Sequence, residues 1–200
     1  MADYSHIIPF IFHYEDAVPL SWADRPLQEQ FGRAKELGLV ILPFDKGGPT
    51  VCGVTYNTYT LWCKSVGRGK PTVEQMVTMS LEDWLGVYKT LFWDKICGDG
   101  IGDQGVADML VDWCWTSGVP WPVRRLQGIL HVKQDGIVGP KTLYELNCWN
   151  GDLLTEELRK ERIDYYEGIA KRDPNQRQFL KGWINRANDC AKWKEANINV

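Results

Sequence analysis

The sequence has 200 residues, of which 44% are hydrophobic and 24% are charged, and its formal net charge is −3. This length and composition are typical of a globular chain that buries a sizeable core in one domain or two small ones. A weakly acidic chain lacks the clustered basic surface that nucleic acid binding requires. No apolar run approaches the length that spans a membrane. We therefore expect no nucleic acid partner and no stable membrane insertion.

The N-terminus and the cysteines indicate the compartment. No basic segment opens the chain, and its apolar stretch, residues 7–12, is short and contains Pro9, unlike a secretory signal peptide. The six cysteines include no CxxC pair. In a chain without an export signal such cysteines are expected to be reduced thiols. We therefore predict a protein without a signal peptide that is initially cytoplasmic.

Ten tryptophans are distributed along the chain. Indole rings favour burial in a core, which is their usual use, and their faces also stack on sugars. The tryptophan content is therefore compatible with a carbohydrate ligand and with packing alone.

Hydrophobic periodicity and capping residues predict a mainly α chain. Pro9 in the first of these helices is tolerable because it lies near the start. The pattern also predicts one small β element near residues 40–55, made of a short buried strand at 40–44 and a hairpin. A Gly/Lys/Pro linker follows at 66–72. The predicted helices span residues 1–15, 23–39, 55–62, 80–96, 106–118, 123–132, 139–147, 155–172 and 175–193.

Motifs for nucleophilic, phosphate-binding or dinucleotide-binding sites are absent from the sequence. Three scattered histidines are too few for a metal site. Asp99 and Asp103 lack the spacing of a calcium loop and are expected to belong to a turn. We therefore expect no metal and no cofactor, and carboxylates remain as the candidate catalytic groups.

Glu15, at the end of the first predicted helix, and Asp45, in the glycine-rich loop, form the candidate pair. Burial at the end of an apolar helix disfavours a charged carboxylate, so such a glutamate can hold a proton and act as a general acid. An aspartate and hydroxyl groups across a cleft can stabilise an oxocarbenium-like centre or orient a water molecule. Spacing alone favours the plainer interpretation, which is a solvated glutamate at a helix end and an aspartate in a turn.

Several segments resemble, in the same order, the glycoside hydrolase family 108 muramidases, which include phage endolysins and proteins described as secretion activators. These segments are "MADYSHIIPFIFHYE", "DKGGPTVCGVTYNTY", "VADMLVDWCWTSG", "LQGILHVKQDGIVGPKTL" and "FLKGWINR". The resemblance covers nearly the whole chain. It implies a lysozyme-like helical fold with a small β-hairpin element, and cleavage of the peptidoglycan strand next to N-acetylmuramic acid.

The resemblance also implies site residues. The family's catalytic glutamate ends the first helix in a Glu-Gly-Gly triplet, and an Asp-x-Gly-Gly-x-Thr loop follows about ten residues later. Here Glu15 is followed by Asp16 and Ala17, and the loop comes about twenty residues later than in the family. Glu36 reproduces the spacing to the loop without a gap and is the alternative acid. The remaining predicted site residues are Asp45 and Thr50 as catalytic groups, and Gly47, Gly48, Thr55, Tyr56 and Tyr59 as substrate-binding groups.

The resemblance divides the chain into a lysozyme-like catalytic region, residues 1–118, and a helical peptidoglycan-binding-like region, residues 119–200, packed on it. Asp112 is predicted to be primarily a structural hydrogen-bonding residue and only secondarily a site residue. The function predicted is a peptidoglycan hydrolase, an N-acetylmuramidase that works by general acid catalysis. The alternative is a catalytically weak peptidoglycan-binding or secretion-assisting protein. Either would reach the periplasm or cell wall through a holin or another export partner.

Overall fold

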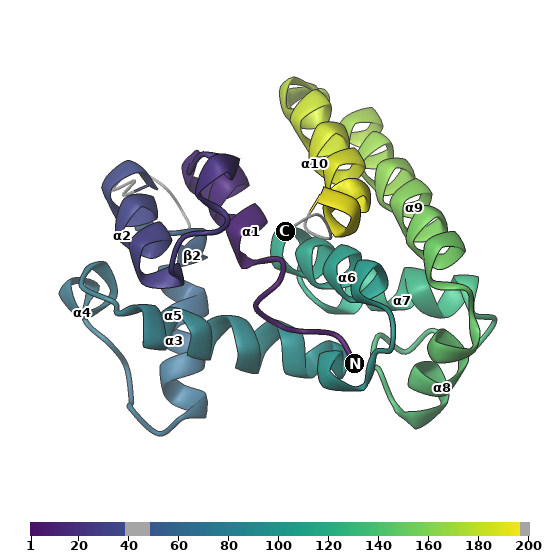
Figure 1. The fold of residues 1–200 in the computed structure, drawn as a ribbon, viewed down its shortest axis with the longest axis horizontal. Coiled ribbons are helices and arrows are strands. Elements are labelled where there is room, and N and C mark those ends of the chain that lie inside the picture. Colours follow the sequence, from purple (N-terminus) through teal and green to yellow (C-terminus); the bar gives the residue numbers. More distant parts are fainter. Residues whose placement is uncertain (39–48, 197–200) are drawn as a thin grey trace. The chain divides into compact units, whose positions relative to one another are not determined.

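The computed structural model describes residues 1–38 and 49–196. These residues form a mainly α structure with one two-stranded hairpin in the described part (Figure 1), as the sequence predicts. The chain divides into two compact units, one made of Ile7–Leu91 and the other of Met1–His6 with Phe92–Val200. Within the described ranges, no helix is both long enough and apolar enough to cross a membrane. The predicted strand at 40–44 lies outside the described residues.

The unit Ile7–Leu91 contains five helices and the hairpin among its described residues. In chain order its elements are α1 (Ile8–Asp16), α2 (Leu27–Gly38), β1 (Thr50–Val51), β2 (Val54–Thr55), α3 (Tyr56–Ser65), α4 (Val73–Val77) and α5 (Leu81–Tyr88). The first helix begins at Ile8, later than predicted, with Pro9 in its first turn, where a missing N–H costs no helical hydrogen bond.

Hydroxyl side chains start three helices of this unit. Thr55 accepts the N–H of Thr58 at the start of α3, and Ser80 accepts the N–H of Asp83 at the start of α5. Thr72 forms a capping box with Gln75 and starts α4, a short helix that the sequence analysis did not predict. Each cap satisfies a backbone donor that the first helical turn leaves free.

Aromatic rings from three helices form the core of this unit. Phe12 of α1 contacts Phe31 of α2 at 6.0 Å and Trp84 of α5 at 4.8 Å between ring centroids. The ring of Trp84 stacks on Tyr88 at 5.7 Å. The indole N–H of Trp84 donates to the carbonyl oxygen of Cys52 at 2.9 Å. This last bond fixes the turn of the hairpin to α5.

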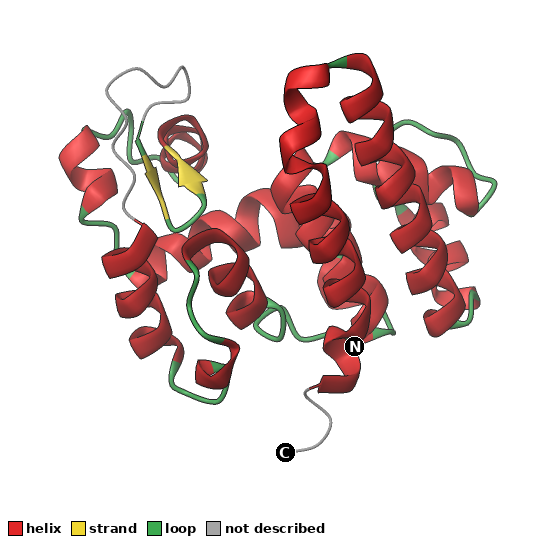
Figure 2. Ribbon diagram, turned by 90° about the horizontal axis from the view of Figure 1, so that it is seen from above, coloured by secondary structure: helices red, strands yellow, loops and turns green. Residues whose placement is uncertain are grey.

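The second unit is built from five helices among its described residues. They are α6 (Gln104–Ser117), α7 (Pro120–Ile129), α8 (Pro140–Cys148), α9 (Gly151–Arg172) and α10 (Arg177–Ala196). The two long helices α9 and α10 run side by side, and α6 packs against both (Figures 1 and 2). The predicted helix at 80–96 is α5 followed by a π-helical segment, Lys89–Trp93, and a 3-10 turn, Asp94–Ile96.

A buried ion cluster joins these three helices. The Asp112 carboxylate of α6 accepts hydrogen bonds from Arg162 of α9 at 2.8 Å and from Arg186 of α10 at 2.7 Å. Burial alone would raise the pKa of Asp112, but the charges of Arg186 and Arg162 outweigh burial and lower it. The prediction of a structural role for Asp112 agrees with these contacts.

The N-terminal segment is attached to the same unit. His6 Nδ1 lies 2.7 Å from the buried Asp108 carboxylate of α6, and the indole N–H of Trp193 donates to the His6 carbonyl oxygen at 3.0 Å. The hydrogen bond to Asp108 raises the pKa of His6. Gln104 also donates to Asp108, at 2.8 Å. Residues 2–6 are therefore fixed by side chains of α6 and α10.

Replacing Asp112 by Asn should destabilise the protein by about 3–5 kcal/mol, because two buried guanidinium groups would lose their counter-charge. The free energy of unfolding, measured in urea, tests this. In the wild type the contribution should be present above about pH 4 and should be lost as the pH falls through the lowered pKa of Asp112.

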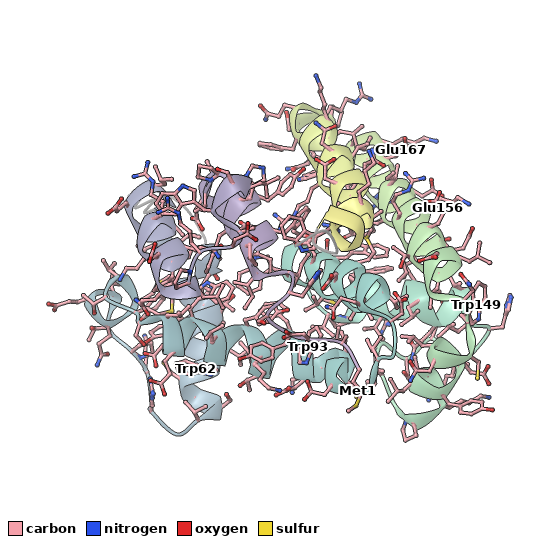
Figure 3. All side chains as sticks on the ribbon, viewed as in Figure 1. Met1, Trp62, Trp93, Trp149, Glu156 and Glu167 are labelled. Carbon is pink, nitrogen blue, oxygen red and sulfur yellow. The ribbon has the colours of Figure 1, made fainter. Side chains whose placement is uncertain are left out.

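The matched control is Glu156→Gln on the outer side of α9 (Figure 3), where Glu156 pairs with Arg159 at the surface. An exposed pair of this kind contributes at most about 1 kcal/mol. Equal losses for the two variants would contradict the structural importance of the buried cluster.

Candidate active site

The end of α1 is fixed by its backbone. Ala17 adopts a left-handed conformation, with φ of 55°, and its N–H donates to the His13 carbonyl oxygen. The Val18 N–H donates to the Phe12 carbonyl oxygen at 3.3 Å, and Val18 O lies 2.8 Å from His13 Nδ1. These bonds close the last turn of the helix. They hold Glu15 and Asp16 at a defined end of an apolar helix.

The two carboxyl groups at this end lie in different environments. Glu15 is exposed, whereas Asp16 is only 4% exposed. Asp16 is four residues after Phe12, so it continues the helix face that packs on Phe31 and Trp84. Glu15 is therefore a solvated glutamate at the helix end, as its spacing alone favours, and Asp16 occupies the buried position. Helical spacing from Phe12 was the signal that could have identified Asp16 from the sequence.

Burial changes the protonation of Asp16. Burial, and secondarily the charge of Glu15, raises the pKa of Asp16 to about 7. Its Oδ2 atom is buried without a hydrogen-bond partner in the described structure. Asp16 is thus a buried carboxyl with a raised pKa at the end of an apolar helix, which is the environment that the sequence analysis expected for a general acid.

The hairpin β1–β2 pairs Thr50 with Thr55 and Val51 with Val54. Both valines are buried, so the two threonines share the opposite, outer face of the ladder. The turn between the strands consists of Cys52 and Gly53, both with positive φ, at 47° and 73°. This is the backbone geometry of a tight two-residue hairpin turn. Asp45, Gly47 and Gly48 lie outside the described residues.

The hairpin turn lies in the electrostatic field of the end of α1. The pKa of the buried Cys52 thiol is raised by burial first and then by the charge of Asp16, while the charge of Lys35 lowers it. Charges act strongly only over short distances in such an environment. The hairpin turn at Cys52 is therefore near two charged groups, the buried Asp16 carboxyl of α1 and the Lys35 ammonium group of α2.

A hollow of about 560 Å³ lies next to Lys35. It is lined by α2 residues, among them Gly32 and Lys35, and by the segment that starts α5, including Ser80. The Lys35 ammonium group donates to the Met79 carbonyl oxygen at 3.1 Å on the wall of the hollow. A hollow of this size is in the range of ligand-binding sites in proteins.

The other predicted residues of the hairpin region have packing or capping contacts. The Thr55 hydroxyl caps α3 and lies 2.9 Å from the hydroxyl of Thr58. Tyr56 donates its hydroxyl to the Pro71 carbonyl oxygen at 2.6 Å. Tyr59 is 3% exposed, stacks on Trp62 and donates to Asp83 at 3.2 Å. Burial and the charge of Asp83 raise the pKa of Tyr59 to about 12.

Glu36, the alternative acid, lies on α2. Its carboxylate accepts a hydrogen bond from Arg33 at 2.9 Å, and its side chain is 69% exposed. Glu36 is thus a paired carboxylate on the surface of α2.

The acidic segment that the sequence analysis assigned to a turn has structural contacts. Asp99 accepts the indole N–H of Trp93 at 2.7 Å, and Asp103 caps α6 by accepting the N–H of Val106 at 3.0 Å. The described residues contain no cluster of three or more His, Cys, Asp and Glu side chains suited to a metal ion. All six cysteines are free.

Comparison with known proteins identifies two sequence families. Residues 31–118 match the family model of glycosyl hydrolase 108, and residues 121–188 match the model of a predicted peptidoglycan domain. Residues 31–118 belong to glycosyl hydrolase family 108. The chain is thus a peptidoglycan hydrolase of the N-acetylmuramidase kind. The match includes Glu36 and the loop before the hairpin but begins after Glu15.

A solved structure supports the same fold. The structure of Brucella abortus SagA is 24% identical in sequence, covers 98% of this chain and 96% of its own, and has a TM-score of 0.73. At this identity the similarity shows a shared fold, which is the lysozyme-like helical fold expected of a family 108 hydrolase. The comparison with curated proteins found no match.

Proposed function

We propose that the family 108 reaction takes place between the end of α1 and the hairpin β1–β2. The observation that carries this proposal is the buried Asp16 carboxyl, which lies beside Glu15 and acts electrostatically on Cys52 in the hairpin turn. A carboxyl that holds a proton near neutral pH, next to one in water, is the arrangement that general acid hydrolysis of a glycoside uses.

In this proposal Glu15 is the catalytic carboxylate that the family motif places at the end of α1. Thr50, on the outer face of the hairpin, holds the attacking water, and Asp45 stabilises the positive charge that develops on the sugar. Gly47 and Gly48 let the backbone approach a sugar closely. The hollow beside α2, about 560 Å³ in volume, offers space for part of the glycan strand.

Glu36 is the competing assignment, because the family match begins after Glu15 and includes Glu36. Two observations support Glu15. It ends a helix whose apolar face builds the core next to the hairpin, and its neighbour Asp16 provides the buried carboxyl. Glu36 instead pairs with Arg33 at the surface.

Replacing Glu15 by Gln should lower the rate of sacculus hydrolysis about a hundredfold or more and leave the fold intact, because the catalytic carboxylate is lost while an exposed side chain of nearly the same size replaces it. Hydrolysis is measured as release of fragments from purified peptidoglycan, with mass analysis to locate the bond that is cut. Reducing-end muramic acid products identify a muramidase.

Glu36→Gln is the matched control and should keep near-full activity. Both variants should melt at the wild-type temperature. Near-full activity of Glu15→Gln together with an inactive, normally folded Glu36→Gln would show that the spacing to the loop locates the acid. A wild type that binds sacculi without releasing fragments would favour the catalytically weak, secretion-assisting alternative.

We also propose that residues 121–188 hold the glycan strand through an aromatic row in the second unit. Trp121 of α7 contacts Tyr165 at 6.4 Å, and Tyr166 contacts Trp183 at 5.2 Å between ring centroids. Tyr165 and Tyr166 contact each other at 5.6 Å, and Phe179 extends the row from Trp183 at 5.9 Å. Both ends are exposed, Trp121 at 52% and Phe179 at 49%. Exposed ring faces of this kind can stack on sugars.

Replacing Trp121 by Ala should weaken binding to purified sacculi about tenfold, which corresponds to the loss of one ring stacking interaction. Sedimentation of the protein with sacculi measures binding. The control is Tyr144→Ala, which removes an aromatic ring that is 67% exposed on α8, in the same matched region. Equal binding by Trp121→Ala and the wild type would contradict a role for the row.

We propose finally that a holin or another export partner gives the enzyme access to the wall, because peptidoglycan lies outside the cytoplasmic membrane. Expression of the chain alone should leave culture turbidity unchanged, and co-expression with a membrane-permeabilising partner should lower it rapidly. Rapid lysis by the chain alone would contradict the need for such a partner.

A further inference from the structure

The hollow of about 560 Å³ beside α2 lies wholly within the unit Ile7–Leu91. Buried Phe31 and Met79 give it apolar surface, and Lys35 and Glu82 are the two charged side chains among its described lining residues. Ligand sites in proteins have this character, with apolar walls and a few polar groups that fix the orientation of the ligand. The hollow thus has the composition of a binding site and is complete within one unit.

Lys35 presents a positive charge to this hollow. Its ammonium group donates to the Met79 carbonyl oxygen at 3.1 Å and lies 5.7 Å from the centroid of the Phe31 ring. An ammonium group has three N–H donors, and the bond to Met79 uses one of them. The ion pairs among the described residues of this unit do not include Lys35. Lys35 is therefore held on the wall of the hollow with donors left for an anionic group.

Glu82 is the opposing charge. It lies in the first turn of α5, where a carboxylate compensates the positive end of the helix. Glu82 is exposed, whereas Lys35 is half-buried, so solvent screens the charge of Glu82 more strongly. The hollow therefore favours a negative group at Lys35.

Gly32 lies in the interior of α2 and lines the same hollow. Glycine inside a helix is destabilising relative to alanine, and a left-handed backbone or close packing usually explains it. Neither explanation applies, because Gly32 is not among the glycines with positive φ and a Cβ atom at this position would meet nothing within 4 Å. A side chain here would stand at the hollow, so access to the hollow is a reason for glycine.

We propose that this hollow is a subsite for a carboxylate on the side branch of the glycan strand, and that Lys35 binds this carboxylate. Gly32 keeps the space open for the branch. The inference rests on the proposed location of the reaction between the end of α1 and the hairpin. Each muramic acid residue carries a lactyl branch whose carboxyl group is either free or joined to a stem peptide, and a stem peptide ends in a carboxylate. Both sources present the same chemistry to Lys35.

The position of Lys35 agrees with this role. Burial and the charge of Asp16 raise the pKa of the Cys52 thiol in the hairpin turn, and the charge of Lys35 acts against them. The ammonium group is therefore close to the hairpin beside which the strand is proposed to bind. Lys35 holds a group that does not react, so it should contribute equally to binding of the substrate and of the transition state. Loss of such an interaction raises KM and leaves kcat unchanged.

The test is Lys35→Met, which keeps the length of the side chain and removes its charge. We expect the apparent KM for purified sacculi to rise about tenfold, through the loss of one charge-assisted hydrogen bond, with kcat unchanged. Lys35→Arg keeps the charge and should keep the apparent KM near that of the wild type. Added NaCl screens the ion pair, so it should raise the apparent KM of the wild type more than that of Lys35→Met. Lys64→Met removes an exposed lysine of α3 and is the matched control.

Two further variants separate charge from shape. Gly32→Leu fills part of the hollow and should also raise the apparent KM. It should not lower the melting temperature, because leucine favours a helix more than glycine does. Glu82→Gln removes the like charge and should lower the apparent KM.

Modified substrates identify which carboxylate binds. Glycan strands freed of stem peptides by an amidase carry lactyl carboxylates, and conversion to methylamides removes their charge. An effect of Lys35→Met on sacculi alone would assign the carboxylate to the stem peptide. An effect on peptide-free strands that methylamidation abolishes would assign it to the lactyl group.

An apparent KM of Lys35→Met equal to that of Lys64→Met on both sacculi and peptide-free strands would overturn the inference. Equal rises for Lys35→Met and Glu82→Gln would also overturn it, because the hollow would then not select a negative group. A wild-type KM for Gly32→Leu would show that the strand does not enter the hollow. A wild type that cuts neither substrate would instead overturn the hydrolytic site on which the inference rests.

Discussion

A carboxyl group buried away from water has to be neutralised, and this constraint shapes both compact units. Asp112, wholly buried in α6, is neutralised by two guanidinium groups, one from α9 and one from α10. Because a buried charge without a partner is strongly unfavourable, the three helices can pack only if both arginines are in place. The ion cluster thus specifies the register of the three helices as well as their contact.

The same constraint has two other solutions in the chain. Asp108, one turn before Asp112, is held by His6 and Gln104, and this solution ties the N-terminal segment to α6. In the described structure Asp16 Oδ2 has no hydrogen-bond partner, and burial raises the pKa of Asp16 to about 7, which favours its neutral form. The three buried aspartates therefore differ in what lies next to the carboxyl. Asp112 has two arginines, Asp108 has a histidine and a glutamine, and Asp16 Oδ2 has no hydrogen-bond partner in the described structure.

Local signals in the sequence predicted much of the fold. Ser80 marks the start of α5, Thr55 marks the start of α3, and the hairpin lies in the predicted region. The short helix α4 escaped prediction because five residues carry little periodicity, although Thr72 and Gln75 form a capping box. The π-helical segment after Tyr88 leaves no trace in a pattern that continues with helical spacing.

The sequence predicted that the candidate site lies at the end of the first helix, but it did not predict which residue there is buried. The position of Glu15 in the motif identified it as the candidate. Which side chain at the helix end is buried depends instead on which side of α1 faces the core, and the contacts of Phe12 with Phe31 and Trp84 decide that. Asp112 shows the opposite case, since a polar residue within an apolar helix already predicts a buried partner. Which partners it finds depends on α9 and α10, about 50 and 74 residues away.

The family boundary and the packing boundary fall at different places, and the ion cluster explains why. The glycosyl hydrolase match ends at residue 118 and the peptidoglycan domain match begins at 121. Yet α6, the last helix of the hydrolase match, packs with α9 and α10 of the second unit, and its Asp112 is neutralised by their arginines. A hydrolase region cut at residue 118 would leave this carboxylate without its two arginines and would remove the helices α7, α9 and α10 that pack on the buried helix α6. The peptidoglycan domain is thus a physical requirement of the hydrolase sequence as well as a second functional part, because it completes the core around α6.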